Sequence, residues 1–150
     1  MGMYKRYVIT SLLFIAVLFG SRVAAFAQKD KSGYDNMAAE ILRIVNEYRK
    51  GKGLKPLTND IIIAQAAEQH SSNMAMKKIP FGHDGFDGRM ARIRKQMKNT
   101  YGWAENVAYG AEDANEAVDM WLHSDGHRQN IEGDYNRSGI GIAKGKDGQL

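Results

Sequence analysis

The sequence predicts an α+β fold in which four amphipathic helices cover a small sheet. Apolar residues recur at helical spacing in four segments, whereas residues 101–109 alternate with the period of a strand and residues 139–143 form a second strand-like run. The chain has 150 residues and no cysteine, so burial of apolar side chains must stabilise it without disulfides. One globular domain is therefore expected.

Residues 1–27 have the three parts of a secretory signal peptide. Lys5 and Arg6 form a basic start, residues 7–20 form an apolar run, and an Ala-Phe-Ala cleavage site ends at Ala27. We expect cleavage near Ala27 and a secreted or periplasmic location, because the run is short for a membrane span of about 20 residues. An uncleaved membrane anchor is the alternative.

Removal of this segment changes the charge of the chain. Of 21 basic residues 18 remain, against 17 acidic residues, because the segment holds three cations and no acid. A nucleic-acid-binding protein needs a concentrated basic surface, so no nucleic-acid partner is expected. We assign residues 28–34 to a polar linker and residues 35–150 to the domain.

The first two predicted helices precede Pro80. The first covers residues 35–50, where five apolar residues share one face, and the second begins near Thr58 and Asn59. His70 lies on the apolar face of the second helix. A histidine in that position is more often a hydrogen-bonded packing residue than a ligand. The apolar residues of the first helix are Met37, Ile41, Ile44, Val45 and Tyr48.

The third predicted helix begins at Asp87 and carries a basic outer face. Its apolar side has Met90, Ile93 and Met97 but no bulky aromatic anchor, so a solvated basic face is preferred. Contact with anionic head groups or wall polymers is the alternative. The cations assigned to this outer face are Arg89, Arg92, Arg94, Lys95 and Lys98.

Glu105 lies in the alternating segment 101–109, on the same side as large apolar residues such as Trp103 and Val107. A carboxylate in that position is partly desolvated, so it needs a cation, a metal ion or a hydrogen-bond donor. The alternative is an edge-strand carboxylate in water. This argument makes Glu105 a candidate site residue.

The fourth predicted helix starts at the N-cap Asp113 and ends near Ser124. His123 and His127 are four residues apart, as in helical zinc motifs, but Gly126 between them indicates a new helix start and no glutamate follows His123. We therefore exclude His123 and retain His127.

His83, Glu105 and His127 form the candidate site. Each lies in a turn-rich segment with glycines nearby, where scaffolds often present functional side chains, and imidazole and carboxylate bind divalent metals or transfer protons. We predict His83 and His127 as metal ligands, and for the alternative of an enzyme we assign the catalytic roles to Glu105 and His127. Two histidines are fewer than the three ligands usual for catalytic zinc, so zinc or another divalent cation would bind weakly.

Several motifs occur in the order found in bacterial proteins of the CAP (SCP/PR-1-like) family, which the chain resembles over residues 35–150. That resemblance implies an α/β/α sandwich with a small antiparallel sheet between helical layers. It also implies a cleft in which His83 and His127 bind a divalent ion beside Glu105, with Ser124 where many eukaryotic members have a second glutamate. The motifs are Asn46 with Arg49, Phe81-Gly82-His83, Ala104-Glu105-Asn106, Trp121 to Ser124, Gly126 to Ile131 and Gly139-Ile140-Gly141.

The C-terminal residues suggest a missing strand. Asp147-Gly148 is a hairpin signal after the run 139–143, and only Gln149 and Leu150 follow. The family would continue with a closing strand, so we expect a C-terminally truncated domain that lacks its last strand. Its unpaired edge could support self-association through strand addition.

Three classes of function are compatible with these residues. The resemblance favours a non-catalytic extracellular module that binds a small ligand, a lipid or a wall component. The alternative is a metal-dependent hydrolase or peptidase with Glu105 as general base. A serine hydrolase that pairs Ser124 with His127 is the weakest, because Ser124 has no nucleophile-elbow context.

Overall fold

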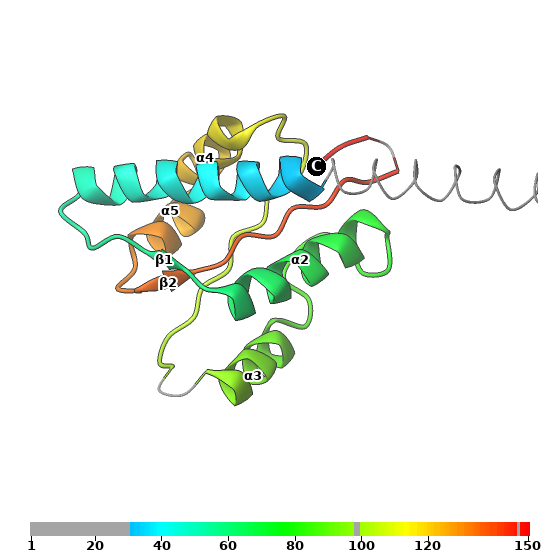
Figure 1. The fold of residues 1–150 in the computed structure, drawn as a ribbon, viewed down its shortest axis with the longest axis horizontal. Coiled ribbons are helices and arrows are strands. Elements are labelled where there is room, and N and C mark those ends of the chain that lie inside the picture. Colours follow the sequence, from blue (N-terminus) through cyan, green and yellow to red (C-terminus); the bar gives the residue numbers. More distant parts are fainter. Residues whose placement is uncertain (1–30, 98–99, 147) are drawn as a thin grey trace, which may run out of the picture. The chain divides into compact units, whose positions relative to one another are not determined.

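The computed structural model describes residues 31–97, 100–146 and 148–150 (Figure 1). The chain divides into two compact units, one that ends at Asp35 and one that covers residues 36–150. The helices and strands after the first helix all belong to the second unit. The predicted signal peptide and residues 28–30 lie outside the described residues. Residues 31–51 are helical, so the first helix begins before the predicted residue 35, and residues 31–34 are not irregular. An i,i+4 ion pair of 3.6 Å between Lys31 and Asp35 fits this extension.

The second unit contains short paired strands between helices. Figure 1 shows α2 and α3 on one side of the strands and the first helix with α4 and α5 on the other, which is the layered α+β arrangement that was predicted. The elements after the first helix are β1 (Thr58–Asn59), α2 (Ile61–Ala75), α3 (Phe86–Gln96), α4 (Ala114–Leu122), α5 (Asp125–Glu132) and β2 (Arg137–Ser138). Ser124 is the N-cap of α5, so a new helix does start where Gly126 indicated.

The sheet differs from the prediction. β1 and β2 pair in parallel, with Thr58 opposite Arg137, whereas an antiparallel sheet was expected. A parallel pair requires a long crossover connection, and here the four helices α2 to α5 and more than 70 residues separate the strands. Neither residues 101–109 nor residues 139–143 form a strand.

Residues 139–143 pack against the backbone of α2 instead of pairing in a sheet. A Cβ atom at Gly139 would lie 2.1 Å from the Ala64 nitrogen, and one at Gly141 would lie 2.0 Å from the Glu68 nitrogen. The Ser71 hydroxyl also donates to the Gly141 carbonyl over 2.9 Å. The small residues that resembled a strand face therefore permit close contact with a helix.

The core lies between the first helix, α4 and α5. Its side chains are largely aliphatic and small, which lets these helices approach closely. The buried members are Ile41, Val45, Ala111, Ala114, Ala117, Val118 and Ile131.

Arg49 joins the end of the first helix to two later segments. It is 1% exposed, and its guanidinium donates to the carbonyls of Lys55, Ile131, Gly133 and Tyr135. These four acceptors belong to the loop before β1, to the last turn of α5 and to the connection between α5 and β2. Arg49 therefore holds together the chain segments that lead into the two strands.

The C-terminal turn is only partly described, because Asp147 lies outside the described residues. Gly148 has a φ of 86°, and the Gly145 amide donates to the Gln149 carbonyl over 2.7 Å. The Leu150 carbonyl accepts from the Gly110 amide, also at 2.7 Å. Self-association through strand addition at the C-terminal residues stays a prediction. In the described part of the chain, no helix is both long and apolar enough to cross a membrane.

We expect Gly141→Ala to destabilise the domain by about 3 kcal/mol, because the new methyl group meets the α2 backbone, which cannot move aside as a flexible side chain could. Gly126→Ala is the matched control: a methyl group there meets nothing within 4 Å, and alanine favours the helix. Urea unfolding measures both. Equal stability of the two variants would contradict this packing.

Asp60 caps α2 and pairs with Arg137 of β2. Its carboxylate accepts from the Ile62 amide over 2.9 Å and lies 2.6 Å from the Arg137 guanidinium. Burial by itself would raise the pKa of Asp60. The hydrogen bonds from Arg137 and from the Ile62 and Ile63 amides outweigh burial and hold the pKa below its ordinary value.

We expect Asp60→Asn to lower the free energy of unfolding by about 1 kcal/mol at pH 7. The amide can still cap α2, but it cannot form an ion pair with Arg137. A lowered pKa in the folded state stabilises the domain above the unfolded pKa of about 3.9, and this contribution is lost as the pH falls through the folded value. The stability difference between wild type and variant should therefore shrink from pH 7 to pH 3. A constant difference in urea unfolding would contradict the assignment.

Candidate functional site

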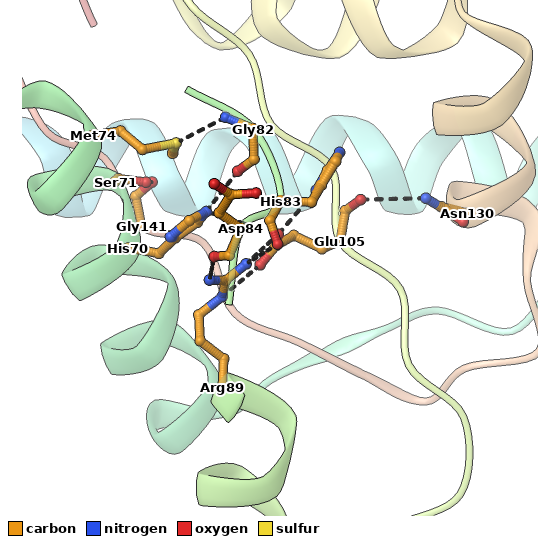
Figure 2. Close-up of polar contacts among 10 residues, drawn as sticks. All are labelled: His70, Ser71, Met74, Gly82, His83, Asp84, Arg89, Glu105, Asn130 and Gly141. Atoms are coloured by element: carbon orange, nitrogen blue, oxygen red, sulfur yellow. Dashed lines mark hydrogen bonds and ion pairs between the residues drawn. The ribbon is translucent and has the colours of Figure 1, made fainter. Parts of the chain in front are cut away.

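Glu105 is at the centre of a polar cluster, and its side chain is 16% exposed (Figure 2). Arg89 binds both carboxylate oxygens: its Nε lies 2.9 Å from Oε2 and its Nη2 lies 2.6 Å from Oε1. Such a two-point contact is stronger and more directional than a single neutral hydrogen bond. The cation that a partly desolvated carboxylate requires is thus supplied by Arg89.

Arg89 was assigned to the solvated outer face of its helix, and this assignment was wrong. The residue is 6% exposed, and besides Glu105 it donates to the carbonyls of Asp84 and His83. One pattern in the sequence could have identified it. Arg89 precedes Ile93 by four residues and Met97 by eight, and both of these residues are buried.

His83 contacts Glu105, as the candidate site required. Its Nδ1 lies 2.9 Å from Oε1 of Glu105, and its side chain is 50% exposed. Because a carboxylate only accepts, Nδ1 carries the proton and donates it. Nε2 of His83 has no hydrogen-bond partner among the described residues and is open to solvent.

His70 has the packing role that the sequence predicted, but it also lies beside Glu105. It is 5% exposed, and its Nε2 donates to the Gly82 carbonyl over 2.8 Å. The same nitrogen lies 3.8 Å from Oε1 of Glu105. His70 therefore fixes the loop that carries His83, a role that periodicity alone could not reveal.

Among the described residues, no hydrogen bond or ion pair joins the side chain of His127 to this cluster. It lies in the first turn of α5 rather than in a loop, and its ring makes no hydrogen bond or ion pair within the described part of the chain. Its backbone carbonyl accepts from the Asn106 amide over 3.0 Å, and Asn130 donates to Asn106 over 2.9 Å. The link between His127 and Glu105 thus runs through backbone and amide groups.

The residues around Glu105 do not fit a divalent cation in this arrangement. Both oxygens of Glu105 accept from Arg89, whose positive charge opposes a second cation at the same carboxylate. Nε2 of His70 donates its proton to the Gly82 carbonyl, so this nitrogen has no lone pair for a metal ion. Across the described residues no group of three or more histidine, aspartate or glutamate side chains is placed to hold a metal ion. Zinc binding stays a prediction from the resemblance.

One cavity adjoins the cluster, and a second cavity lies beside the first. The first, of about 740 Å³, has mostly apolar walls but includes His70, Arg89 and Glu105, so it is termed the polar cavity; the second, the apolar cavity of about 690 Å³, is lined by residues such as Met74 and Phe81. Neither His83 nor His127 lines them. The two cavities share the wall residues Ser71, Trp121, Ile140 and Gly141.

Trp121 has a feature that sequence reasoning missed. Its indole Nε1 is buried and, among the described residues, it is the one such side-chain nitrogen or oxygen without a hydrogen-bond partner. An unsatisfied buried donor costs about 1–3 kcal/mol. The Trp121 side chain lines both cavities, but its buried Nε1 is not exposed to either of them.

We expect Arg89→Lys to destabilise the domain by about 3 kcal/mol, because lysine cannot bind both oxygens of Glu105 and the carbonyls of residues 83 and 84 together. Arg92→Lys on the same helix is the control, since Arg92 is exposed and should change stability by less than about 0.5 kcal/mol. Chemical denaturation measures both variants. If the Arg89→Lys variant were as stable as the wild type, this cluster would not hold the loop in place.

The comparisons with known proteins agree on one family. The family model described as "CAP: Cysteine-rich secretory protein family" matches residues 42–150. Among curated relatives, Bacillus subtilis YkwD is 31% identical over 108 residues, which are 70% of this chain and 42% of that protein. The B. subtilis membrane protein YlbC is 31% identical over 106 residues, covering 69% of this chain and 30% of that protein.

Two solved structures resemble the fold. A cysteine-rich secretory protein from Staphylococcus aureus is 27% identical with a TM-score of 0.62, covering 74% of this chain and 36% of that chain. An extracellular protein containing an SCP domain from Bacillus anthracis is 26% identical with a TM-score of 0.65, covering 73% and 38%. This chain therefore spans less than half the length of each relative. The fold, the ordered motifs and these matches together show that the chain belongs to the CAP family of cysteine-rich secretory proteins.

Proposed function

We propose that this CAP domain is an extracellular binding module in which the two adjoining cavities take a small molecule. The observation that carries the proposal is the presence of two adjoining cavities that share the wall residues Ser71, Trp121, Ile140 and Gly141. Both cavities have volumes in the range of small-molecule sites, about 300–1,000 Å³.

The geometry of Glu105 supports binding rather than catalysis. A general base needs a free oxygen within reach of the proton it removes, and both oxygens of Glu105 accept from Arg89. In this arrangement Glu105 orients His83 and neutralises Arg89. The hydrolase alternative, with Glu105 and His127 as catalytic residues, has no such geometric support.

A serine hydrolase has even less support. Ser124 caps the start of α5, and no hydrogen bond joins its hydroxyl to His127 within the described residues. Nucleophilic catalysis by serine needs an adjacent base that accepts its proton.

The extracellular location in this proposal has two supports. Residues 1–27 have the composition of a signal peptide, and the similar B. anthracis structure is described as an extracellular protein. A small ligand, a lipid or a wall component would all be encountered there.

The cluster around Glu105 gives the polar cavity a rigid wall. Arg89 connects Glu105 to the carbonyls of His83 and Asp84, and His70 holds Gly82, so the loop is fixed from two helices. A rigid wall reduces the entropy that is lost when a ligand binds.

We expect Trp121→Phe to lower ligand recovery about fivefold, because the smaller ring removes about 1 kcal/mol of apolar contact from the wall that both cavities share. The measurement is solvent extraction of protein purified from a secreting bacterial host, followed by mass spectrometry of the extracted small molecules per mole of protein. Folding should be unaffected, since the removed donor has no protein partner.

Trp103→Phe is the control for this experiment. Trp103 lines the polar cavity alone, so the same change of ring should lower recovery less than Trp121→Phe does. An empty wild-type protein, or equal recovery from wild type and Trp121→Phe, would refute the proposal.

A further inference from the structure

We propose that the two adjoining cavities form one slot, and that this slot binds a short extended peptide as an added strand between residues 103–108 and residues 139–143. The peptide backbone pairs with the backbone of both segments, and its side chains occupy the cavities. This inference rests on the proposed function and names the chemical class of its ligand.

Both segments line the slot along its length. Residues 102–107 and 139–141 line the polar cavity, whereas Ala108 and residues 140–143 line the apolar cavity. Each segment therefore continues from the lining of one cavity into the lining of the other. A ligand that follows both segments must be extended and about as long as residues 103–108.

The backbone amides of both segments are unpaired among the described residues. No amide of residues 103–108 or 139–143 donates to a backbone carbonyl, and all of these residues except Ala104 are at least partly buried. An unpaired backbone donor away from water costs about as much as a lost hydrogen bond. An extended peptide presents carbonyls at the spacing that a row of such amides requires.

The carbonyls of the first segment show which of its edges is free. Two side chains from later segments donate to the carbonyls of Trp103 and Glu105. The carbonyls of residues 104, 106 and 108 accept from no described residue. Successive residues of an extended chain point their backbone groups to opposite edges. The unused groups thus recur at every second residue, as on one edge of a strand that still lacks its neighbour.

Gln149 and Leu150 show the width of the slot at one end. The Gln149 carbonyl accepts from the Gly145 amide, and the Leu150 carbonyl accepts from the Gly110 amide, both over 2.7 Å. Gly145 and Gly110 lie just beyond the two segments, so one piece of chain bridges both walls there. Neighbouring strands lie about 4.7–4.9 Å apart, and the slot at this end is therefore one strand wide.

The helices on either side of the slot favour apolar side chains on both faces of the peptide. Leu42 and Val45 of the first helix line the polar cavity, as do Ile63 and Ala66 of α2. A strand that is covered by helices on both faces carries a nearly continuous run of residues such as valine and isoleucine. The peptide class is therefore apolar and rich in β-branched residues.

The test is hydrogen exchange of the full chain, measured by mass spectrometry, with the acetylated and amidated peptide Lys-Val-Thr-Val-Ile-Val-Lys. The terminal lysines keep the probe soluble. We expect the peptide to slow deuterium uptake in residues 103–108 and in residues 139–143 together, because pairing protects the amides of both walls.

The control is the same peptide with N-methyl groups at its three valines. It keeps every side chain but loses alternate N–H donors, so it cannot form a complete ladder with the slot. Half-maximal protection should require about tenfold more of this peptide than of the parent.

A variant tests the slot from the side of the protein. Ala143→Pro removes one amide that has no acceptor among the described residues, and it should raise the half-maximal concentration of the parent peptide about fivefold. Ala143→Ser keeps the amide and should bind like the wild type. Melting temperatures show whether both variants fold, and if Ala143→Pro does not, the two peptides on the wild type still decide.

Protection by neither peptide, or equal protection by both, would overturn strand pairing. Protection that develops without peptide as the protein concentration rises would assign the slot to a second copy of the chain and would also overturn the peptide class. The extraction experiment is independent of these outcomes. If the wild type releases a non-peptide molecule that Trp121→Phe retains poorly, the proposed function stands and only the peptide class fails.

Discussion

The buried guanidinium of Arg49 is the interaction on which the rest of the fold depends. A charged group at 1% exposure is tolerated only if its donors are satisfied, and Arg49 satisfies them with four backbone carbonyls from two distant segments. Those segments lead into β1 and β2, whose parallel pair holds the two helical layers together. No carboxylate pairs with Arg49 among the described residues, so its position depends on the path of the backbone.

Arg89 is also a buried cation, but a carboxylate balances its charge, and this ion pair forms the centre of the site. Its charge is balanced by Glu105, and its remaining donors bind the loop that carries His83. The cluster is therefore a structural unit that keeps a histidine at the surface and a carboxylate below it. Both oxygens of Glu105 accept from Arg89, and Oε1 also lies 2.9 Å from Nδ1 of His83.

Helix α2 links the cluster to both cavities. Its Asp60 cap is bound by Arg137, His70 reaches Glu105 and Gly82, and Ser71 and Met74 line the apolar side. Glycines of the segment 139–143 approach the same helix closely. The wall that the two cavities share is formed by Ser71 of α2, Trp121 of α4, and Ile140 and Gly141 of the segment 139–143.

The sequence by itself predicted the helical segments, the α+β class and the family. Those features depend on local periodicity and on ordered motifs, which a single chain displays. Only the tertiary structure decided that Arg89 is the partner of Glu105, that His83 donates to Glu105 and that β1 pairs in parallel with β2. Arg89 resembled a solvated cation because its role depends on a carboxylate 16 residues away. The glycines of residues 139–143 indicated a strand because sequence cannot show that a helix backbone lies against them.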